Sequence, residues 1–157
     1  MEIRELSEVN TIDLKEALSL VWAVFNEFES PDYVPEGITV FREFISFDSI
    51  SKMLEKGTLR LWASYEGEVL TGVIAVRGQT HISLLFVHRE YHRRGIARAL
   101  FTVVERSCKS ADMDTITVNS SPFAVGAYHS LGFVDTDNET VINGIRFTPM
   151  RYEIGHE

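Results

Sequence analysis

Apolar residues follow two different periods along this chain. In residues 14–28 and 94–110 they recur every three or four positions, as on the buried face of a helix. In residues 59–87 they run almost continuously or alternate with polar residues, as in strands that are buried on one or both faces. Gly67 and Gly78 lie in polar turns that divide this second region. The pattern therefore predicts a chain that mixes helices and strands.

The boundaries of the predicted elements follow from these periods and from the turn residues. Strands are predicted at residues 2–6, 59–65, 69–76, 81–87, 115–119, 133–138 and 144–153. Helices are predicted at residues 14–28, 38–45, 48–55, 94–110 and 122–131. The order is one strand, two or three helices, three antiparallel strands, a helix, a strand, a helix and two strands. The crossover from strand 81–87 to strand 115–119 should be parallel and right-handed. We therefore expect an α/β fold with one mixed sheet.

Composition narrows the class of protein. A length of 157 residues fits a single domain, residues 1–157, with one sizeable core. The formal net charge of −8 argues against general nucleic-acid binding, which needs a basic surface. This charge is compatible with a cationic substrate such as an amine, although acidic surfaces also arise for solubility alone.

The one cysteine, Cys108, falls beside a helical apolar stripe and is expected in the core. The N-terminal segment lacks the pattern of a signal peptide, and no apolar run reaches the roughly 20 residues of a membrane span. A cytoplasmic protein without membrane contact is expected.

Residues 84–100 combine an apolar strand, a basic turn with a glycine, and the start of a helix. At a helix start four backbone N–H groups lack intrahelical partners, and the positive end of the helix dipole favours an anion. Gly95 lets a ligand approach the backbone closely because it has no Cβ. Arg93, Arg94 and Arg98 add positive charge and forked donors that suit phosphate oxygens. In an acidic chain, this clustering favours a phosphate site over a solvated basic patch.

This segment resembles the cofactor motif of the GNAT N-acetyltransferase superfamily. That motif reads Gln or Arg, two residues of any kind, Gly, any residue, and then Gly or Ala. Here the six positions are His92, Arg93, Arg94, Gly95, Ile96 and Ala97, with His92 where the family has Gln or Arg. In the family this loop holds the pyrophosphate of acetyl-coenzyme A. The order of predicted elements also matches the GNAT fold over nearly the whole chain, so the resemblance implies an enzyme, an acetyl-coenzyme A-dependent N-acetyltransferase.

A second resemblance lies in residues 119–133. In GNAT enzymes a strand that ends in Asn leads to a helix that carries Ala, then Tyr, then Gly-Phe; here these are Asn119, Ala124, Tyr128 and Gly132-Phe133. By resemblance, Asn119 hydrogen-bonds the pantetheine arm, and Tyr128 lies beside the thioester sulfur and protonates the departing thiolate. A phenol of pKa near ~10 can donate to a thiolate of pKa near ~8.5 if its surroundings are tuned. The alternative for Tyr128 is an amphipathic residue with a buried ring and a hydroxyl at the surface.

An amine acceptor must lose a proton before it attacks, because an alkyl ammonium has a pKa near ~10. In some family members a Glu on the strand before the motif takes this proton, and the matching position here is His81. By the period of two, His81, Ser83, Leu85 and Val87 should share one strand face. An imidazole of pKa near ~6.5 is a suitable base at neutral pH. The equal alternative is a strand-end histidine that faces solvent.

The acceptor region, about residues 22–55, is the least family-like part of the chain. In the family the end of the first helix and the following loop line the acceptor site, which makes Glu27 and Glu29 candidates for substrate binding. The alternative for both is a solvated acidic face. The aromatic residues of this region are candidates for an apolar pocket or, more commonly at helical spacing, for the core: Trp22, Phe25, Phe28, Tyr33 and Phe41. The acceptor, a small-molecule or peptide amine, stays open.

The resemblance assigns the cofactor site to Leu85, Phe86, Val87, His92, Arg93, Arg94, Gly95, Ile96, Ala97, Arg98, Asn119, Ala124 and Tyr128. In the family the strand before the motif splays from its parallel neighbour, so that its backbone can pair with pantetheine amides and Phe86 or Val87 can stabilise an oxyanion. Neither a metal nor a covalent enzyme intermediate is required. The rival to direct transfer in a ternary complex is a non-catalytic acyl-coenzyme A-binding sensor or interaction module on the same fold. A monomer or a homodimer is expected.

Overall fold

The computed structural model describes residues 1–155. The strands are β1 (Glu2–Leu6), β2 (Leu59–Glu66), β3 (Val69–Arg77), β4 (His81–Val87), β5 (Thr115–Ser120), β6 (Val134–Asp135), β7 (Thr140–Ile142) and β8 (Ile145–Glu153). The helices are α1 (Thr11–Phe28), α2 (Pro35–Phe44), α3 (Phe47–Lys56), α4 (Ile96–Ser110) and α5 (Val125–Leu131). Single 3-10 turns lie at Ser30–Asp32, Arg89–Tyr91 and Pro122–Ala124.

The strands form one mixed sheet. Their order is β1-β2-β3-β4-β5-β8-β6, and β7 pairs with β8 beside this path. Every pair of neighbours is antiparallel except β4 and β5, which are parallel and are joined through α4. The predicted α/β fold with a mixed sheet and one parallel crossover is therefore confirmed.

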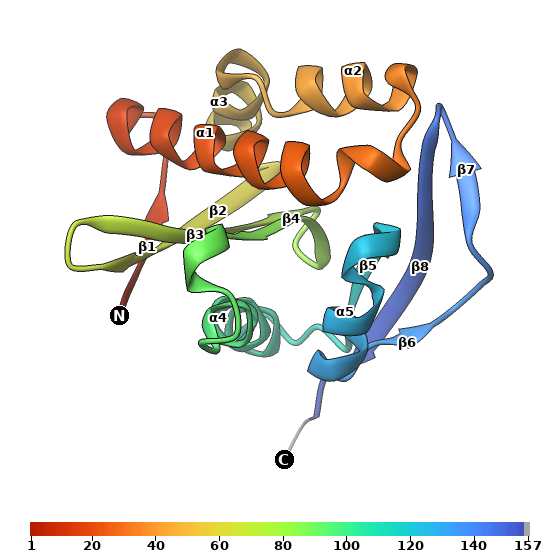
Figure 1. The fold of residues 1–157 in the computed structure, drawn as a ribbon. Coiled ribbons are helices and arrows are strands. Elements are labelled where there is room, and N and C mark those ends of the chain that lie inside the picture. Colours follow the sequence, from red (N-terminus) through yellow and green to blue (C-terminus); the bar gives the residue numbers. More distant parts are fainter. Residues whose placement is uncertain (156–157) are drawn as a thin grey trace.

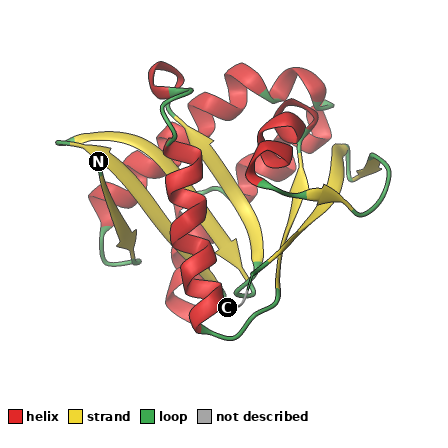
Figure 2. Cartoon of the chain, turned by 90° about the horizontal axis from the view of Figure 1, so that it is seen from below, coloured by secondary structure: helices red, strands yellow, loops and turns green. Residues whose placement is uncertain are grey.

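Helices cover both faces of the sheet. α1, α2 and α3 lie over one face, and α4 and α5 lie over the other (Figure 1). Seen from below, α4 runs across the strands of the N-terminal half of the sheet (Figure 2). α4 packs closely on β3 because Gly72 has no side chain: a Cβ there would lie 2.9 Å from Leu100 Cδ1 and 3.0 Å from Ile96 Cγ2. The start of α4 is thereby fixed against the sheet.

The sheet opens between β4 and β5. These strands pair at two positions, His81 with Thr117 and Ile82 with Val118, and then diverge toward their carboxyl ends. The divergence is visible in Figure 1, where α5 lies beside the gap. Because paired strands would otherwise fill this space with ladder hydrogen bonds, the opening leaves room for a ligand at the centre of the sheet.

A β-bulge in β4 accompanies this opening. The register with β3 shifts between Ala75 and Val76, where one residue of β3 is opposed by two of β4. As a result Ile82 packs in the core on the α4 side, whereas Leu84 and Phe86 pack in the core on the α1 side. The expected shared face of His81, Ser83, Leu85 and Val87 is therefore wrong: Leu85 and Val87 pack on the α4 side, and His81 points away from the side that its neighbour Ile82 occupies.

Several predicted boundaries shift for local reasons. The helix expected from residue 94 begins at Ile96, because Gly95, with φ 79°, is its N-cap. The helix expected from residue 122 opens with a 3-10 turn and becomes α-helical at Val125. The strand expected at residues 133–138 ends at Asp135, since Pro149 opposite accepts from Thr136 N–H but has no N–H to return.

Candidate active site

Two cavities meet at the opening between β4 and β5. One, of about 460 Å³, lies between α2, β4, β5 and the turn before β8; Tyr33, Phe41 and Phe44 line it, and we call it the aromatic cavity. The other, of about 320 Å³, lies between β4, the loop before α4 and α5, and we call it the motif cavity. Five residues line both cavities: Glu29, Leu85, Phe86, Ala124 and Tyr128. These five form the junction where a group in one cavity can reach a group in the other.

The loop before α4 presents backbone donors to the motif cavity. Arg93 and Gly95 both have left-handed backbone conformations, with φ 63° and 79°. The first hydrogen bond of α4 runs from Ala99 N–H to Gly95 O at 3.0 Å, so the N–H groups of Ile96, Ala97 and Arg98 precede the helical ladder. The N-cap residue Gly95 has no side chain that could cap these groups, and the first turn has no acidic residue. This helix start is therefore suited to an anionic ligand.

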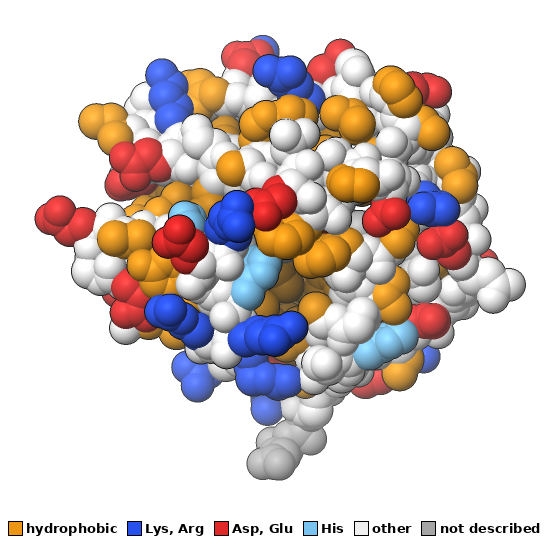
Figure 3. Space-filling view, viewed as in Figure 1, with side chains coloured by type: hydrophobic (Ala, Val, Ile, Leu, Met, Phe, Trp, Pro, Cys, Tyr) orange, Lys and Arg blue, Asp and Glu red, His pale blue; other side chains and the backbone are white. Residues whose placement is uncertain are grey.

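Three arginines surround this loop, and the structure gives each a different setting. Arg93 and Arg98 line the motif cavity, and Arg98 also donates to Ser130 O at 2.8 Å, which ties α4 to α5. Arg94 lies outside the cavity lining, with its guanidinium 4.9 Å from the Tyr91 ring centroid. Within residues 1–155 none of the three has a carboxylate at ion-pair distance. Figure 3 shows Lys and Arg side chains gathered beside a hollow with an apolar floor at this part of the surface.

His92 fixes the loop to the strand before it. Its Nε2 lies 2.8 Å from the Val87 carbonyl oxygen; since a carbonyl only accepts, we assign the proton to Nε2. Its ring packs at 5.2 Å from the Phe28 ring, which stacks in turn on Phe123 at 5.1 Å. His92 thus holds the loop against β4 and α1 at the first position of the motif.

The backbone of β4 points its free edge toward the opening. His88 N–H donates to Thr71 O at 2.8 Å, and hydrogen-bonded pairs alternate along an antiparallel ladder. With Phe86 opposite Val73, the backbone groups of Phe86 face β3, whereas those of Leu85 and Val87 face the gap from which β5 has diverged. The expectation that the Phe86 N–H could serve an oxyanion is therefore wrong, because that group belongs to the ladder.

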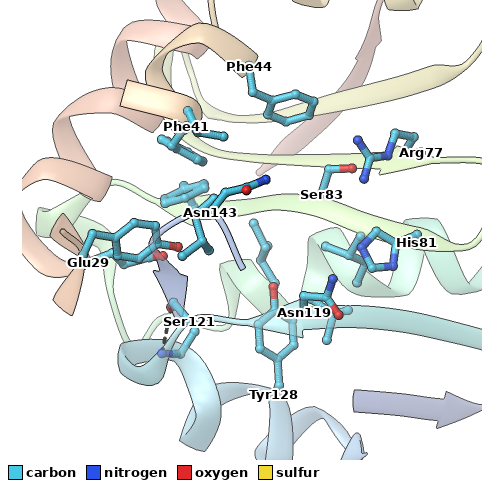
Figure 4. A pocket seen from close by; sticks show the side chains of 18 residues that line it. Glu29, Phe41, Phe44, Arg77, His81, Ser83, Asn119, Ser121, Tyr128 and Asn143 are labelled. Carbon is cyan, nitrogen blue, oxygen red and sulfur yellow. Dashed lines mark hydrogen bonds between the residues drawn. The ribbon is translucent and has the colours of Figure 1, made fainter. Parts of the chain in front are cut away.

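Tyr128 stands at the junction of the cavities. It is only 6% exposed, and the edge contact with Phe133 at 5.4 Å orients its ring. Figure 4 shows its hydroxyl pointing into the cavity, with Asn119 beside it. Burial raises the pKa of the phenol, and the nearby Glu29 carboxylate raises it further. The hydroxyl is therefore protonated throughout the physiological pH range and is a donor.

Glu29 follows α1 directly and is 9% exposed. Burial raises the pKa of its carboxyl to about 7; the Asp32 charge also raises it, and a hydrogen bond with the Ser121 side chain opposes the shift. A carboxyl group with the usual pKa would be ionised at pH 7 and would hold no proton. Glu29 instead can both accept and release a proton near neutral pH.

His81 lines the aromatic cavity but not the motif cavity. Its Nδ1 lies 2.9 Å from Thr117 Oγ1. Burial lowers the pKa of the imidazole, and the positive charge of Arg77 lowers it further, so the ring is neutral at pH 7. In Figure 4, His81 and Glu29 lie on opposite sides of Tyr128 and Asn119.

The remaining expected residues divide between the site and the surface. Asn119 lines the aromatic cavity, and Ala124 lines both cavities. Glu27 is exposed, pairs with Arg89 at 3.3 Å and lines neither cavity. The two glutamates near the end of α1 therefore have different surroundings, a distinction that the acidic pattern alone did not give.

The aromatic candidates divide in the same way. Tyr33 and Phe41 line the aromatic cavity, whereas Phe25 is fully buried in the core. Several lining residues were not anticipated as acceptor contacts, among them Phe44, Arg77, Ser83 and Asn143. Arg77 ends β3 and Asn143 is in the turn before β8, so only the tertiary fold brings them to α2. A cation before a turn glycine, as in Arg77-Gly78, carries no sequence signal for a site.

The fold thus places two cavities side by side, and they meet at the buried Glu29 carboxyl and Tyr128 hydroxyl. A family model described as an acetyltransferase (GNAT) domain matches residues 29–154. The chain therefore belongs to the GNAT acetyltransferase family and is an acyltransferase. No curated protein sequence matches it.

Solved structures show the same fold at low sequence identity. The PaiA N-acetyltransferase from Thermoplasma acidophilum, in complex with coenzyme A, is similar with a TM-score of 0.78 and 19% identity, over 98% of this chain and 99% of that chain. A GCN5-related N-acetyltransferase from Rhodopseudomonas palustris has a TM-score of 0.78 and 19% identity, over 97% and 94%. An aminoglycoside 6'-N-acetyltransferase from Enterococcus faecium has a TM-score of 0.69 and 15% identity, over 100% and 99%.

Two further observations concern the described residues as a whole. In residues 1–155 no helix has the length and apolar character that crossing a bilayer requires. The same residues hold no group of three or more histidine, cysteine, aspartate or glutamate side chains placed to bind a metal ion. Cys108 is buried, as its place beside the helical stripe predicts.

Proposed function

We propose that this protein transfers the acetyl group of acetyl-coenzyme A to a primary amine by direct attack in a ternary complex. The observation that carries the proposal is the meeting of two cavities at Glu29 and Tyr128. One cavity carries the backbone donors and arginines that suit a pyrophosphate, and the other is open for an acceptor. A thioester at the junction would face an amine without any need for a covalent enzyme intermediate.

The motif cavity fits coenzyme A in three respects. The start of α4, with the N–H groups of residues 96–98 and the Arg93 and Arg98 side chains, suits the pyrophosphate. The gap-facing backbone of Leu85 and Val87 suits the pantetheine amides, with the Asn119 side chain across the opening. Acetyl-coenzyme A supplies an activated acyl group with a thiolate as leaving group. In this proposal the Val87 N–H donates to the carbonyl oxygen as negative charge develops there.

Glu29 is the base in this proposal. Its carboxyl titrates near neutral pH at the junction, so it can take the proton from an ammonium, directly or through water. The nitrogen then bonds to the acetyl carbon as the carbon–sulfur bond breaks, and it releases its second proton to solvent as the amide forms. Tyr128 donates a hydrogen bond to the departing thiolate, which takes up a proton from solvent. His81 lies at the other side of the aromatic cavity. In this proposal it contacts the acceptor body and does not act as the base.

Acetyl-coenzyme A turnover with a panel of primary amines tests the proposal, with release of free thiol as the signal. Tyr128→Phe should lower kcat by about 100-fold or more, because the donor to the sulfur is lost. The matched control is Tyr65→Phe, since the Tyr65 hydroxyl is buried without a partner in residues 1–155 and lies outside both cavities. Micromolar binding of acetyl-coenzyme A with no turnover of any amine would replace the enzyme mechanism by a binding module.

A further inference from the structure

The aromatic cavity has groups of opposite charge at its two ends. Glu29 lies at the junction with the motif cavity, where the acetyl group is transferred in the proposed function. Arg77, the last residue of β3, lines the other end (Figure 4). The rings of Phe41 and Phe44 stand along the cavity between them. A molecule that filled this cavity would therefore meet an acid at one end, apolar surface in the middle and a cation at the other end.

Arg77 is held in place but its charge is not neutralised. Its guanidinium lies 5.7 Å from the Phe44 ring centroid, a contact that orients the side chain. In residues 1–155 it has no carboxylate at ion-pair distance, although acidic residues outnumber basic ones, 23 to 15, in the sequence. Its charge reaches His81, whose pKa it lowers. A forked cation with free donors at a cavity wall is suited to an oxyanion.

A second, independent observation points the same way. Ser83 lies at the bulge of β4 and lines the aromatic cavity; its Oγ is buried and has no hydrogen-bond partner within residues 1–155. Figure 4 shows this hydroxyl directed toward the Arg77 side chain. A buried hydroxyl without a partner is costly and uncommon, so such a group at a cavity wall indicates a ligand atom that completes it.

Resting on the proposed function, we propose that the acceptor is a primary amine that carries an oxyanion, a carboxylate or a phosphate, at the far end of an apolar body. Arg77 and Ser83 bind the oxyanion, and Phe41 and Phe44 cover the apolar body. The amine then lies at the junction beside Glu29. This arrangement makes Arg77 a determinant of which amine is acetylated rather than of the transfer itself.

Three amines of one shape test the assignment: 4-(aminomethyl)benzoate, its neutral carboxamide, and benzylamine. We expect kcat/KM for the carboxylate to exceed that for the carboxamide by about 10-fold or more. Arg77→Met should abolish this preference, whereas Arg77→Lys should keep part of it because the charge remains without the fork. An arm with the corresponding phosphonate distinguishes a carboxylate site from a phosphate site.

The control variant is Arg106→Met, an exposed arginine of α4 that lines neither cavity and should change no ratio. Equal kcat/KM for the three amines, or a preference that survives Arg77→Met, overturns the assignment and leaves the proposed function intact. If no amine is turned over, calorimetry with 4-methylbenzoate and coenzyme A-saturated protein decides: binding lost in Arg77→Met supports the oxyanion site, and equal or absent binding overturns it. Failure to bind acetyl-coenzyme A would instead refute the proposed function.

Discussion

The motif cavity and the aromatic cavity are built in different ways. Most of the motif cavity comes from one continuous strand–loop–helix unit, residues 85–98, closed by α5. The aromatic cavity draws its residues from elements that are separate in the sequence: α2, β3, β4, β5 and the turn before β8. Recognition in the first is a local property of the chain, and recognition in the second is a property of the tertiary fold.

The chemical groups differ as well. The motif cavity presents backbone N–H groups at a helix start, which persist when side chains change. His92 shows this tolerance: it stands where the family motif has Gln or Arg, yet its bond to Val87 O holds the loop. The aromatic cavity presents side chains, namely the Glu29 carboxyl, the Arg77 guanidinium and the aromatic rings. A single substitution there changes what can bind, so the two halves of the site can change independently.

Replacing Glu29, the proposed base at the junction, should have the largest effect. Glu29→Gln is expected to lower kcat by about 100- to 1000-fold, because the amide cannot take the ammonium proton. Burial places the pKa of Glu29 at about 7, so wild-type kcat at saturating amine should rise with pH through 7, and this limb should vanish in Glu29→Gln. The measurement is a pH–rate profile between pH 5.5 and 9 for both proteins.

His81→Gln serves as the comparison within the same cavity. It should keep the rise through pH 7 and lose less than about 10-fold in kcat, since His81 lines only the aromatic cavity. A larger loss in His81→Gln than in Glu29→Gln, together with loss of the pH limb, would make His81 the base in place of Glu29.

The motif cavity can be broken without touching the aromatic one. Gly95→Val should weaken acetyl-coenzyme A binding by about 100-fold, because Gly95 has φ 79° and a β-branched residue would shift the loop and crowd the ligand. Gly57→Val is the matched control: φ is 75°, no atom lies near its absent Cβ, and Gly57 lines neither cavity. Calorimetry should give an unchanged Kd for the control, and equal losses in both variants would trace the effect to general strain.

The junction carboxyl should also couple stability to pH. Glu29 has a folded pKa of about 7 against an ordinary 4.5, so below pH 4.5 both folded and unfolded chains hold the proton. Between these values the unfolded chain ionises first, and the free energy of unfolding falls as pH rises. The loss, about 1 to 3 kcal/mol, is complete above pH 7. The stability of Glu29→Gln relative to the wild type should therefore increase from pH 4 to pH 8. Thermal melts across this range measure the difference.

Glu27→Gln is the control for this effect, since Glu27 is exposed and pairs with Arg89 on the surface. Its melting temperature should follow the wild type across the same pH range within the small effect of a surface pair. If Glu29→Gln and Glu27→Gln show the same pH dependence, burial of Glu29 is not the cause.

The sequence predicts the motif half of the site because its information is local. A strand, a glycine turn and a helix start within residues 84–100 place the proposed phosphate-binding groups without any distant contact. The mixed sheet and its one parallel crossover were predicted from the order of elements along the chain. Strict alternation failed at the β4 bulge, since the extra residue is set by the twist and pairing of β3 and leaves no mark in composition. Arg77 and Asn143 were not predicted as site residues, because residues that lie beside them in the cavity, such as those of α2, are distant in sequence.

The aromatic cavity should be the easier of the two to disturb by substituting a residue that does not line it. Gly37 in α2 meets the turn before β8, and a Cβ at this position would lie 2.4 Å from Gly144 O, which is backbone and cannot swing aside. Gly37→Ala should therefore push α2 from the turn and separate Phe41 from Asn143. We expect KM for the amine to rise by about 10-fold and Kd for acetyl-coenzyme A to stay within about twofold, as measured by initial rates and calorimetry. Gly126→Ala, in α5 with no atom near its absent Cβ, should change neither constant. If Gly37→Ala weakens both ligands equally, the two cavities form one mechanical unit, and the independence argued from their construction is lost.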